Sequence, residues 1–451
     1  MKTKSTDMGF YKSLLFLAIP IAMQNLITVA VSMMDTVMLG KLGDTVIAAS
    51  SLANQLFFVL TILLFGVSGG AHVLISQFWG KGDIEKIKRV FAIMYRIAIL
   101  LALLFTVIAI FFPMQAMSVF STDAGVIEAG ASYLKIVGFS YVLFALTSST
   151  IITLRSVGTV RISVIVYSVS LVVNTVLNAI FIFGLLGFPA MGIQGAAIAT
   201  LISRMVELMI IAIFLFKIED KIRLRFSDLM KAARTDYLLY LNASLPIIGN
   251  ELVWALGNMT TTIIIGRMGT EIAAASSITT VVFQFVTVFA FGISSGSGVM
   301  IGNTIGAGEY EIAKKRSRGV IVLAIILGLI SAIFMFILRP FAINFYDVSE
   351  LARAAAFEIM ASSAICMVFQ VTAVVSMMGI LRSGGDNRFV LVADTIFLWL
   401  FAIPLGFLAA FVFHLPVGLV YLCLKSDEIL KVLFSIPRVF KGKWINDVTK
   451  Q

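Results

Sequence analysis

The sequence predicts an all-α membrane protein with twelve transmembrane helices, arranged as two six-helix lobes that are related by a parallel internal repeat. Three observations predict this fold class. Apolar runs of 20 or more residues recur along the whole chain. Lys and Arg residues concentrate in every second segment between these runs. The second half of the sequence also repeats the first.

The hydropathy excludes a chain of soluble domains. Of the 451 residues, 60% are hydrophobic and 13% are charged, whereas a soluble domain has about 25% charged residues. Lipid offers no partner for free backbone groups, so a run that spans it must be a helix. We expect spans, with ends uncertain by a few residues, at 13–38, 46–77, 91–112, 131–154, 160–184, 193–216, 240–264, 272–302, 319–338, 357–381, 388–411 and 414–436.

The basic residues predict the topology. The two ends of the chain and the segments after the even-numbered spans hold 27 of the 34 Lys and Arg residues, and the other segments hold four. The positive-inside rule then places both termini in the cytoplasm of a multi-pass cell-membrane protein. This distribution accounts for the net charge of +10, and we expect no nucleic-acid partner. The first span is too long for a cleaved signal peptide, so we expect it to be retained.

The repeat is visible when the sequence is shifted against itself. At an offset of 226 residues, positions 20–89 match 246–315 at 23 of 70 positions without a gap, and Pro20 falls on Pro246. With one residue inserted, the match continues at an offset of 227, where Pro113 meets Pro340. Because prolines and charged residues match as well as Leu and Val, chance similarity of two apolar halves does not explain the register.

The repeat also predicts the domain organisation. Six spans per half give both halves the same orientation in the membrane, and rocking of two such lobes around a central cavity gives alternating access. We therefore expect an N-terminal lobe at 1–216, a cytoplasmic linker at 217–239 and a C-terminal lobe at 240–451. The linker has six basic and four acidic residues, and its Ser227-Asp228 is typical of a helix N-cap. We interpret it as a solvated connection that lets the lobes move.

Residues for enzyme chemistry are few. The two histidines, His72 and His414, have no metal-ligand partner at helical spacing, and no phosphate-binding loop is present. The two cysteines, Cys366 and Cys423, lie in predicted spans and are typical of small core residues. We expect no catalytic residues, no enzyme activity and no cofactor.

An acidic residue within a span predicts function, because a carboxylate in hydrocarbon is costly and faces a cavity by default. Asp35 lies near the outer end of the first span. Asn174 and Asn178 lie one helical turn apart on the fifth span, and Thr200 lies at a similar depth on the sixth. One carboxylate with amide and hydroxyl oxygens suits H⁺ or Na⁺. A structural alternative is an Asp that caps the helix end beside two interhelical amide bonds.

A second coupling or substrate site is predicted around Glu251, which lies near the midplane of the seventh span beside Asn250. The repeat mates of this pair are Asn25 and Gln24, just after Pro20. A structural alternative is hydrogen bonding of groups freed by a proline. Asp394, six residues into the eleventh span, faces the cavity or pairs with Arg388 or Arg382. Arg204 and Glu207, three residues apart on the sixth span, favour a neutralising pair within the helix.

These features together resemble the multidrug and toxic compound extrusion family over essentially the whole chain. The resemblance rests on the order of several short motifs rather than on a single one. The motifs are Pro20-Ile21, Asp35-Thr36-Val37-Met38-Leu39-Gly40, Gln77-Phe78-Trp79-Gly80, Leu154-Arg155-Ser156-Val157-Gly158 with its copy Leu381-Arg382-Ser383-Gly384-Gly385, the pair Asn174 and Asn178, and Gly195-Ala196-Ala197-Ile198-Ala199-Thr200.

The resemblance implies a secondary antiporter that exports drugs or other small organic, often cationic, compounds in exchange for H⁺ or Na⁺. It implies a cation site at Asp35, Asn174, Asn178 and Thr200, and Na⁺ at Asp35 is the one metal ion we consider. Asn178 stands where some members carry a second acid, so the coupling ion stays open. The tenth span carries only Glu358 at its outer edge, which leaves a C-terminal cation site open.

The alternative is a lipid-linked precursor flippase of the same superfamily, which would need a wide basic cavity, whereas Arg204 is the only deep cation in the predicted spans. A sugar carrier of the major facilitator type would show an acidic and basic signature in the loop after the second span, which Gly80-Lys81-Gly82-Asp83 does not match. A receptor would not require a two-lobe repeat. We expect small organic substrates, contact with the lipid bilayer and a monomer.

Overall fold

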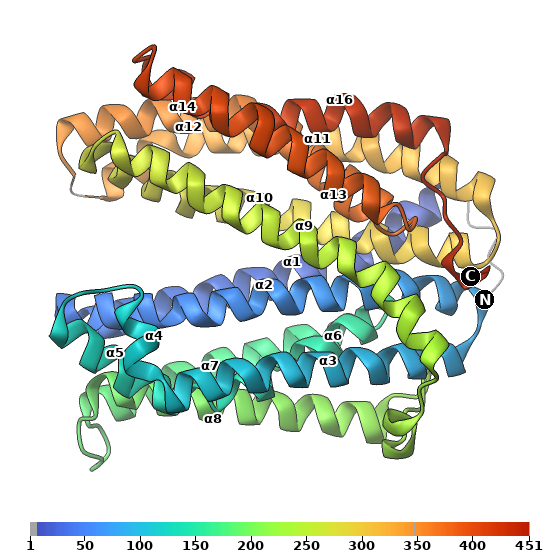
Figure 1. Ribbon diagram of the computed structural model, residues 1–451, viewed down its shortest axis with the longest axis horizontal. Coiled ribbons are helices and arrows are strands. Elements are labelled where there is room, and N and C mark those ends of the chain that lie inside the picture. The colour runs from blue at the N-terminus through green and yellow to red at the C-terminus, as the bar shows by residue number, and fades with distance from the viewer. Residues whose placement is uncertain (1–6, 347, 451) are drawn as a thin grey trace. The chain divides into compact units, whose positions relative to one another are not determined.

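A computed structural model of the chain describes residues 7–346 and 348–450. Throughout these residues the regular structure is helical, without strands (Figure 1). The first half of the chain contains α1 (Asp7–Gly40), α2 (Asp44–Lys81), α3 (Ile84–Phe111), α4 (Pro113–Ser118), α5 (Ala124–Val137), α6 (Ser140–Ser156), α7 (Arg161–Phe183) and α8 (Gly192–Ile213), which a π-helical turn, η1 (Phe214–Ile218), extends. A short 3₁₀ helix, η2 (Phe226–Met230), follows in the connection to the second half.

The second half begins with α9 (Arg234–Arg267), α10 (Thr270–Gly306), α11 (Tyr310–Phe345) and α12 (Glu350–Ala373), which continues as the π-helical η3 (Val374–Leu381). It ends with α13 (Asn387–Ile396), the π-helical η4 (Phe397–Ala402), α14 (Ile403–Phe411), α15 (Val417–Leu424), α16 (Ser426–Lys441) and the short 3₁₀ helix η5 (Val448–Lys450).

The predicted fold class is confirmed, because each of the twelve predicted spans coincides with one helix or with consecutive helices. Nine helices in the described residues are long and apolar enough to cross a membrane, or ten with the bent pair α5 and α6. The predicted span 131–154 is therefore not one straight helix, since its two parts meet at 54° near Gly138. Gly138 allows a close approach here: a Cβ atom would lie 2.8 Å from the Ala109 side chain.

The chain divides into two compact units. The N-terminal unit contains Met23–Ile75 and Asp83–Ser244. The C-terminal unit contains the described residues up to Ala22, the segment Ser76–Gly82, and the chain from Leu245 onward. The lobe boundaries predicted at 216 and 240 remain a proposal.

In the N-terminal unit, small residues bring the helices close together. The core around α2, α3 and α5 contains fully buried alanines, among them Ala49, Ala98 and Ala102, and also the buried Tyr141 of α6. The helices α7 and α8 run side by side (Figure 1). The helix α7 ends at Gly184, whose φ of 73° is the left-handed conformation that glycine adopts without strain. This packing holds the polar faces of α7 and α8 near the end of α1.

In the C-terminal unit, the end of α2 crosses α10 at glycine. A Cβ atom on Gly80 would lie 1.9 Å from the carbonyl oxygen of Asn303, and one on Gly306 would lie 1.7 Å from that of Gln77. In the repeat register of 226 residues, Gly80 corresponds to Gly306 and Gln77 to Asn303. Gly80 therefore packs against Asn303, and its repeat mate Gly306 packs against Gln77, which is the repeat mate of Asn303. At both positions the approach is too close for any residue other than glycine.

The linker differs from its predicted description. It is solvated only in part, because Ile222, Leu224, Asp228 and Asp236 are buried in the N-terminal unit while most of its other residues are exposed. The guanidinium of Arg96 on α3 donates to the carbonyl oxygen of Leu229 at 2.8 Å. The N-cap prediction at Ser227 is also wrong: η2 begins at Phe226, and the Asp228 carboxylate accepts from the Arg225 N–H.

Candidate functional site

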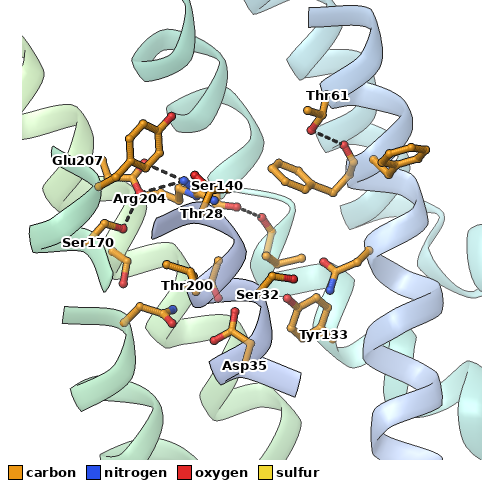
Figure 2. Close-up of a pocket in the computed structure, with 18 of the residues that line it drawn as sticks. Thr28, Ser32, Asp35, Thr61, Tyr133, Ser140, Ser170, Thr200, Arg204 and Glu207 are labelled. Carbon is orange, nitrogen blue, oxygen red and sulfur yellow. Dashed lines mark hydrogen bonds and ion pairs between the residues drawn. The ribbon is translucent and has the colours of Figure 1, made fainter. Parts of the chain in front are cut away.

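A cavity of about 560 Å³ lies within the N-terminal unit and contains most of the predicted coupling site. Residues from α1, α2, α5, α6, α7 and α8 line it, and among them are Asp35, Asn174 and Thr200 (Figure 2). A common depth for these three side chains stays a prediction, and the structure adds that they line one cavity. Depth alone could not show that they face the same space, because that depends on the rotation of each helix.

Asp35 is held by the amide pair of α7. Asn178 Nδ2 donates to Asp35 Oδ1 at 2.5 Å and to Asn174 Oδ1 at 3.1 Å. Asn174 and Asn178 are buried, whereas Asp35 is half-buried and lines the cavity. The Asp35 carboxylate is therefore held by the N–H donor of Asn178 on one side and is open to the cavity on the other.

A second charged group in the same cavity is an ion pair on α8. Arg204 Nη1 lies 2.8 Å from Glu207 Oε2, as the intrahelical pair predicted. Ser170 Oγ donates to Glu207 Oε1 at 2.5 Å, and Figure 2 shows these three side chains joined at some distance from Asp35. Because Glu207 is 1% exposed, its charge needs the partner that Arg204 supplies.

Aromatic side chains complete the cavity wall. Phe57, Phe58, Tyr133 and Tyr167 all line it. The guanidinium of Arg204 lies 4.9 Å from the centre of the Phe144 ring, where a cation is attracted to the ring face. Sequence reasoning did not single out Tyr133 or Tyr167. The cavity thus combines one open carboxylate with polarizable rings.

The residues of the predicted second site are brought together in part, within the C-terminal unit. Arg382 Nη1 lies 2.8 Å from Glu251 Oε1, and the same guanidinium donates to Asn250 Oδ1. Asn250 Nδ2 in turn donates to Asp394 Oδ2 at 2.5 Å. All four side chains are buried. One of the two predicted outcomes for Asp394 was pairing with Arg388 or Arg382, but its cation partner is Lys431 Nζ at 3.0 Å.

Sequence reasoning missed Lys431 and its neighbours. Its ammonium also lies 2.8 Å from Asp427 Oδ2 and 3.7 Å from Glu428 Oε1, and all three residues are buried on α16. One signal could have identified Lys431: in the repeat register of 227 residues it falls on Arg204. Each half therefore carries a cation at the same place in its last span, with Lys431 buried and Arg204 half-buried.

Gln24 and Asn25, the repeat mates of Asn250 and Glu251, belong to the N-terminal unit. Gln24 Oε1 accepts from Arg155 Nη2 at 2.9 Å, and Arg155 is the repeat mate of Arg382. The contact between an arginine and an amide is thus present in both halves. Asn25 is half-buried, and neither residue lines the cavity.

Comparison with known proteins identifies the family. The MatE family model matches residues 20–180 and 246–408, two copies whose starts are separated by the repeat offset. A transporter of Bacillus subtilis, YisQ, is 24% identical over 91% of this chain and 90% of its own. The probable multidrug resistance protein NorM of Thermotoga maritima is 26% identical over 96% of this chain and 93% of its own.

Solved structures agree in fold. A crystal structure of MATE in complex with MaL6 superposes with a TM-score of 0.87 at 17% identity, over 96% of this chain and 97% of that one. The family model covers more than half of this sequence in two successive copies. Membership of this family therefore explains both the internal repeat and the fold. The chain is a multi-pass membrane transporter and belongs to the MatE family, the multidrug and toxic compound extrusion transporters.

Proposed function

We propose that this transporter exports small organic, often cationic, compounds in exchange for protons, and that Asp35 is the residue that couples the two movements. The single observation that carries the proposal is the position of Asp35, which is open to a 560 Å³ cavity on one side and bound by Asn178 on the other. A cavity with aromatic walls and one accessible carboxylate suits an amphipathic cation. The same carboxylate can carry a proton when the cation leaves.

The geometry favours H⁺ over Na⁺ as the coupling ion. A sodium ion, like other hard cations, requires several oxygen ligands. Asn178 presents its N–H group to Asp35, and Asn174 presents its oxygen to Asn178 rather than to the carboxylate. Within the residues that the structure describes, no three acidic, His or Cys side chains form a metal-binding group. A proton needs only the Asp35 oxygen itself.

The flippase alternative is not favoured. Recognition of a pyrophosphate needs several cations free to bind it. Arg204 is the cation of the cavity lining, and Glu207 already holds it.

For the predicted second site around Glu251 and Asp394 we propose the structural alternative. Glu251 and Asp394 have counter-ions at 2.8 Å and 3.0 Å, which supports a role in holding α9, α13 and α16 together. In this proposal the C-terminal unit moves as a rigid body during transport. We also propose that both termini lie in the cytoplasm.

The test is dye efflux from everted vesicles with the pH gradient and the Na⁺ gradient imposed separately. We expect a pH gradient alone to drive accumulation in the wild type. The variant Asp35→Asn keeps the shape of the side chain but cannot change charge, so it should insert normally and lose gradient-driven accumulation. Asp44→Asn, at the start of α2, is the matched control and should transport normally.

Two results would contradict the proposal. Uphill efflux by Asp35→Asn at wild-type rates would place coupling elsewhere, with Glu251 as the next candidate. Transport that follows only the Na⁺ gradient would show that Na⁺ rather than H⁺ is the coupling ion.

A further inference from the structure

The linker between the halves contains nearly as many acidic as basic residues, but the fold buries most of the acids and leaves a basic surface. Residues 217–239 contain six basic and four acidic side chains. Three of the acids, Glu219, Asp228 and Asp236, are buried, with exposed fractions of 9%, 4% and 2%. Their negative charges are therefore used inside the N-terminal unit and are not presented to solvent.

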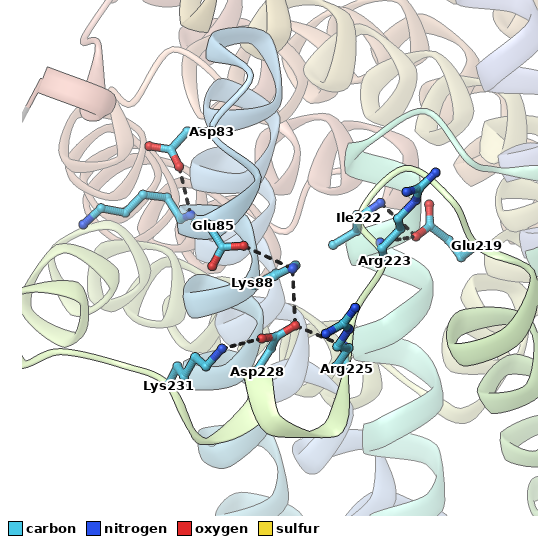
Figure 3. A network of polar contacts seen from close by, with 10 residues as sticks. Asp83, Glu85, Lys88, Glu219, Ile222, Arg223, Arg225, Asp228 and Lys231 are labelled. Carbon is cyan, nitrogen blue, oxygen red and sulfur yellow. Dashed lines mark hydrogen bonds and ion pairs between the residues drawn. The ribbon is translucent and has the colours of Figure 1, made fainter.

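Each buried acid has identified partners, and Figure 3 shows those of Glu219 and Asp228. The Glu219 carboxylate accepts from the backbone N–H groups of Lys221 and Ile222, both at 2.9 Å. Asp236 binds Lys86 on α3 at 2.6 Å.

Asp228 lies 3.3 Å from Lys88 on α3 and 3.1 Å from Lys231. Burial alone would raise the pKa of the Asp228 carboxyl, but the bonds from Lys231, the Arg225 backbone and Lys88 outweigh it and hold that pKa below its ordinary value. These contacts fasten the linker to α3.

The bases of the same segment point outward. Lys217, Arg223, Arg225 and Arg234 are exposed. Asp220 is the one acid of this segment that is exposed as well. The outer face of the linker, which we define by these four basic residues together with the apolar residues described next, therefore carries a clear positive excess.

Large apolar side chains stand among these bases. Ile218, Phe226 and Met230 are 62%, 71% and 80% exposed. Phe226 stacks on Phe216 at 4.1 Å, just beyond the end of α8, and still leaves most of its ring uncovered. Exposed aromatic and aliphatic groups beside Arg and Lys are the composition of segments that lie in a membrane interface.

We propose that the outer face of the linker docks on anionic lipid headgroups, with Phe226 and Met230 inserted at the level of the acyl-chain boundary. The linker begins where the membrane helix α8 ends, so a bilayer surface is the partner nearest to it. Anionic headgroups complement the four outward bases. Because bonds to α3 already order the segment, docking costs little conformational entropy.

The test uses the full-length protein in vesicles, with an environment-sensitive fluorophore on Phe226→Cys and with Cys366 and Cys423 replaced by Ala. We expect emission to shift to the blue, and to be quenched by brominated lipids, in vesicles that contain phosphatidylglycerol. Pure phosphatidylcholine should give a much smaller response. Neutralising Arg223, Arg225 and Arg234 to Gln should weaken the phosphatidylglycerol dependence by about fivefold per residue.

The matched control is Phe188→Cys. Phe188 also contacts another phenylalanine, Phe181, but lies in the turn 184–191, which has no charged residue. Its probe should respond equally in both kinds of vesicle. The proposal is overturned if the emission of the probe at position 226 is the same with and without phosphatidylglycerol. It is also overturned if the phosphatidylglycerol dependence is unchanged when the three arginines are neutralised. Both outcomes are independent of the transport assay on Asp35.

Discussion

The two halves of the chain surround cations at corresponding positions with different partners. The last predicted span of each half carries a cation at corresponding positions, the half-buried Arg204 and the buried Lys431. In the N-terminal unit that cation meets one carboxylate, Glu207, beside a cavity. In the C-terminal unit it meets three carboxylates, on Asp394, Asp427 and Glu428.

A second pair of positions shows the same contrast. Arg155 binds the neutral amide of Gln24, whereas Arg382 binds the corresponding amide of Asn250 and also the carboxylate of Glu251. The comparison shows that the repeat places the cations at corresponding positions, whereas the acids around them differ between the halves. One half keeps an acid, Asp35, that has an amide donor and a cavity. The other half pairs its acids with cations.

The largest effect is expected when the C-terminal network loses its central cation. Lys431→Met leaves three buried carboxylates without their ammonium partner, and an uncompensated buried charge costs about 3–5 kcal/mol. We expect the free energy of unfolding in detergent to fall by that amount. The corresponding change, Arg204→Met, strands one carboxylate instead of three and should cost less. Equal losses for the two variants would remove the contrast between the halves.

The pair Glu251 and Arg382 gives the next effect. Glu251→Gln leaves the buried guanidinium with amide partners alone, so we expect a loss of about 3 kcal/mol in the free energy of unfolding. Adding Arg382→Leu to the same chain removes the stranded charge and should restore most of the stability. If Glu251→Gln instead abolishes proton-driven efflux without loss of stability, the acid couples transport, and the two halves are more alike than proposed.

A transplant tests whether position or environment creates the coupling site. Thr261 is the repeat mate of Asp35 and is buried in the C-terminal unit. Introducing Thr261→Asp into the Asp35→Asn variant restores an acid at the corresponding place, but the mates of Asn174 and Asn178 are Phe401 and Leu405. Without an amide donor, we expect no recovery of dye efflux. Recovery would show that the scaffold position is sufficient.

The smallest effect concerns pH and the linker. The Asp228 pKa lies below the ordinary value of 3.8, so its contribution to stability is fully present above that value. The contribution is lost as the pH falls through the lower pKa of the folded state. We expect Asp228→Asn to cost about 1 kcal/mol at neutral pH. Hydrogen exchange of the linker should show the loss in the variant at pH 7, and the two proteins should converge only in strong acid.

The fold could be predicted because its determinants are local in sequence. A transmembrane helix can be recognised from the length of a single apolar run of about 20 residues. The repeat can be recognised from a single alignment register, which the two ranges matched by the family model confirm. The bend between α5 and α6 could not be predicted this way, because it depends on how Gly138 packs against Ala109.

The candidate site was predictable in depth but not in rotation. Counting residues from the span ends placed Asp35, Asn174 and Asn178 at one level, and the structure adds their hydrogen bonds. Lys431 was missed because its partner Asp394 lies far away in sequence, on another helix. The linker was misread because nothing in its composition shows which of its charges α3 will bury.

The glycine crossing of α2 and α10 has a consequence for symmetry. Gly80 packs against Asn303, and Gly306 packs against Gln77, so a residue and its repeat mate exchange the same contact. Reciprocity of this kind defines an isologous interface, the type that joins two identical subunits around a two-fold axis. A half-length protein with a single copy of the repeat could make this contact twice with its twin. The crossing therefore has, inside one polypeptide, the reciprocal geometry that two identical copies would form around a two-fold axis.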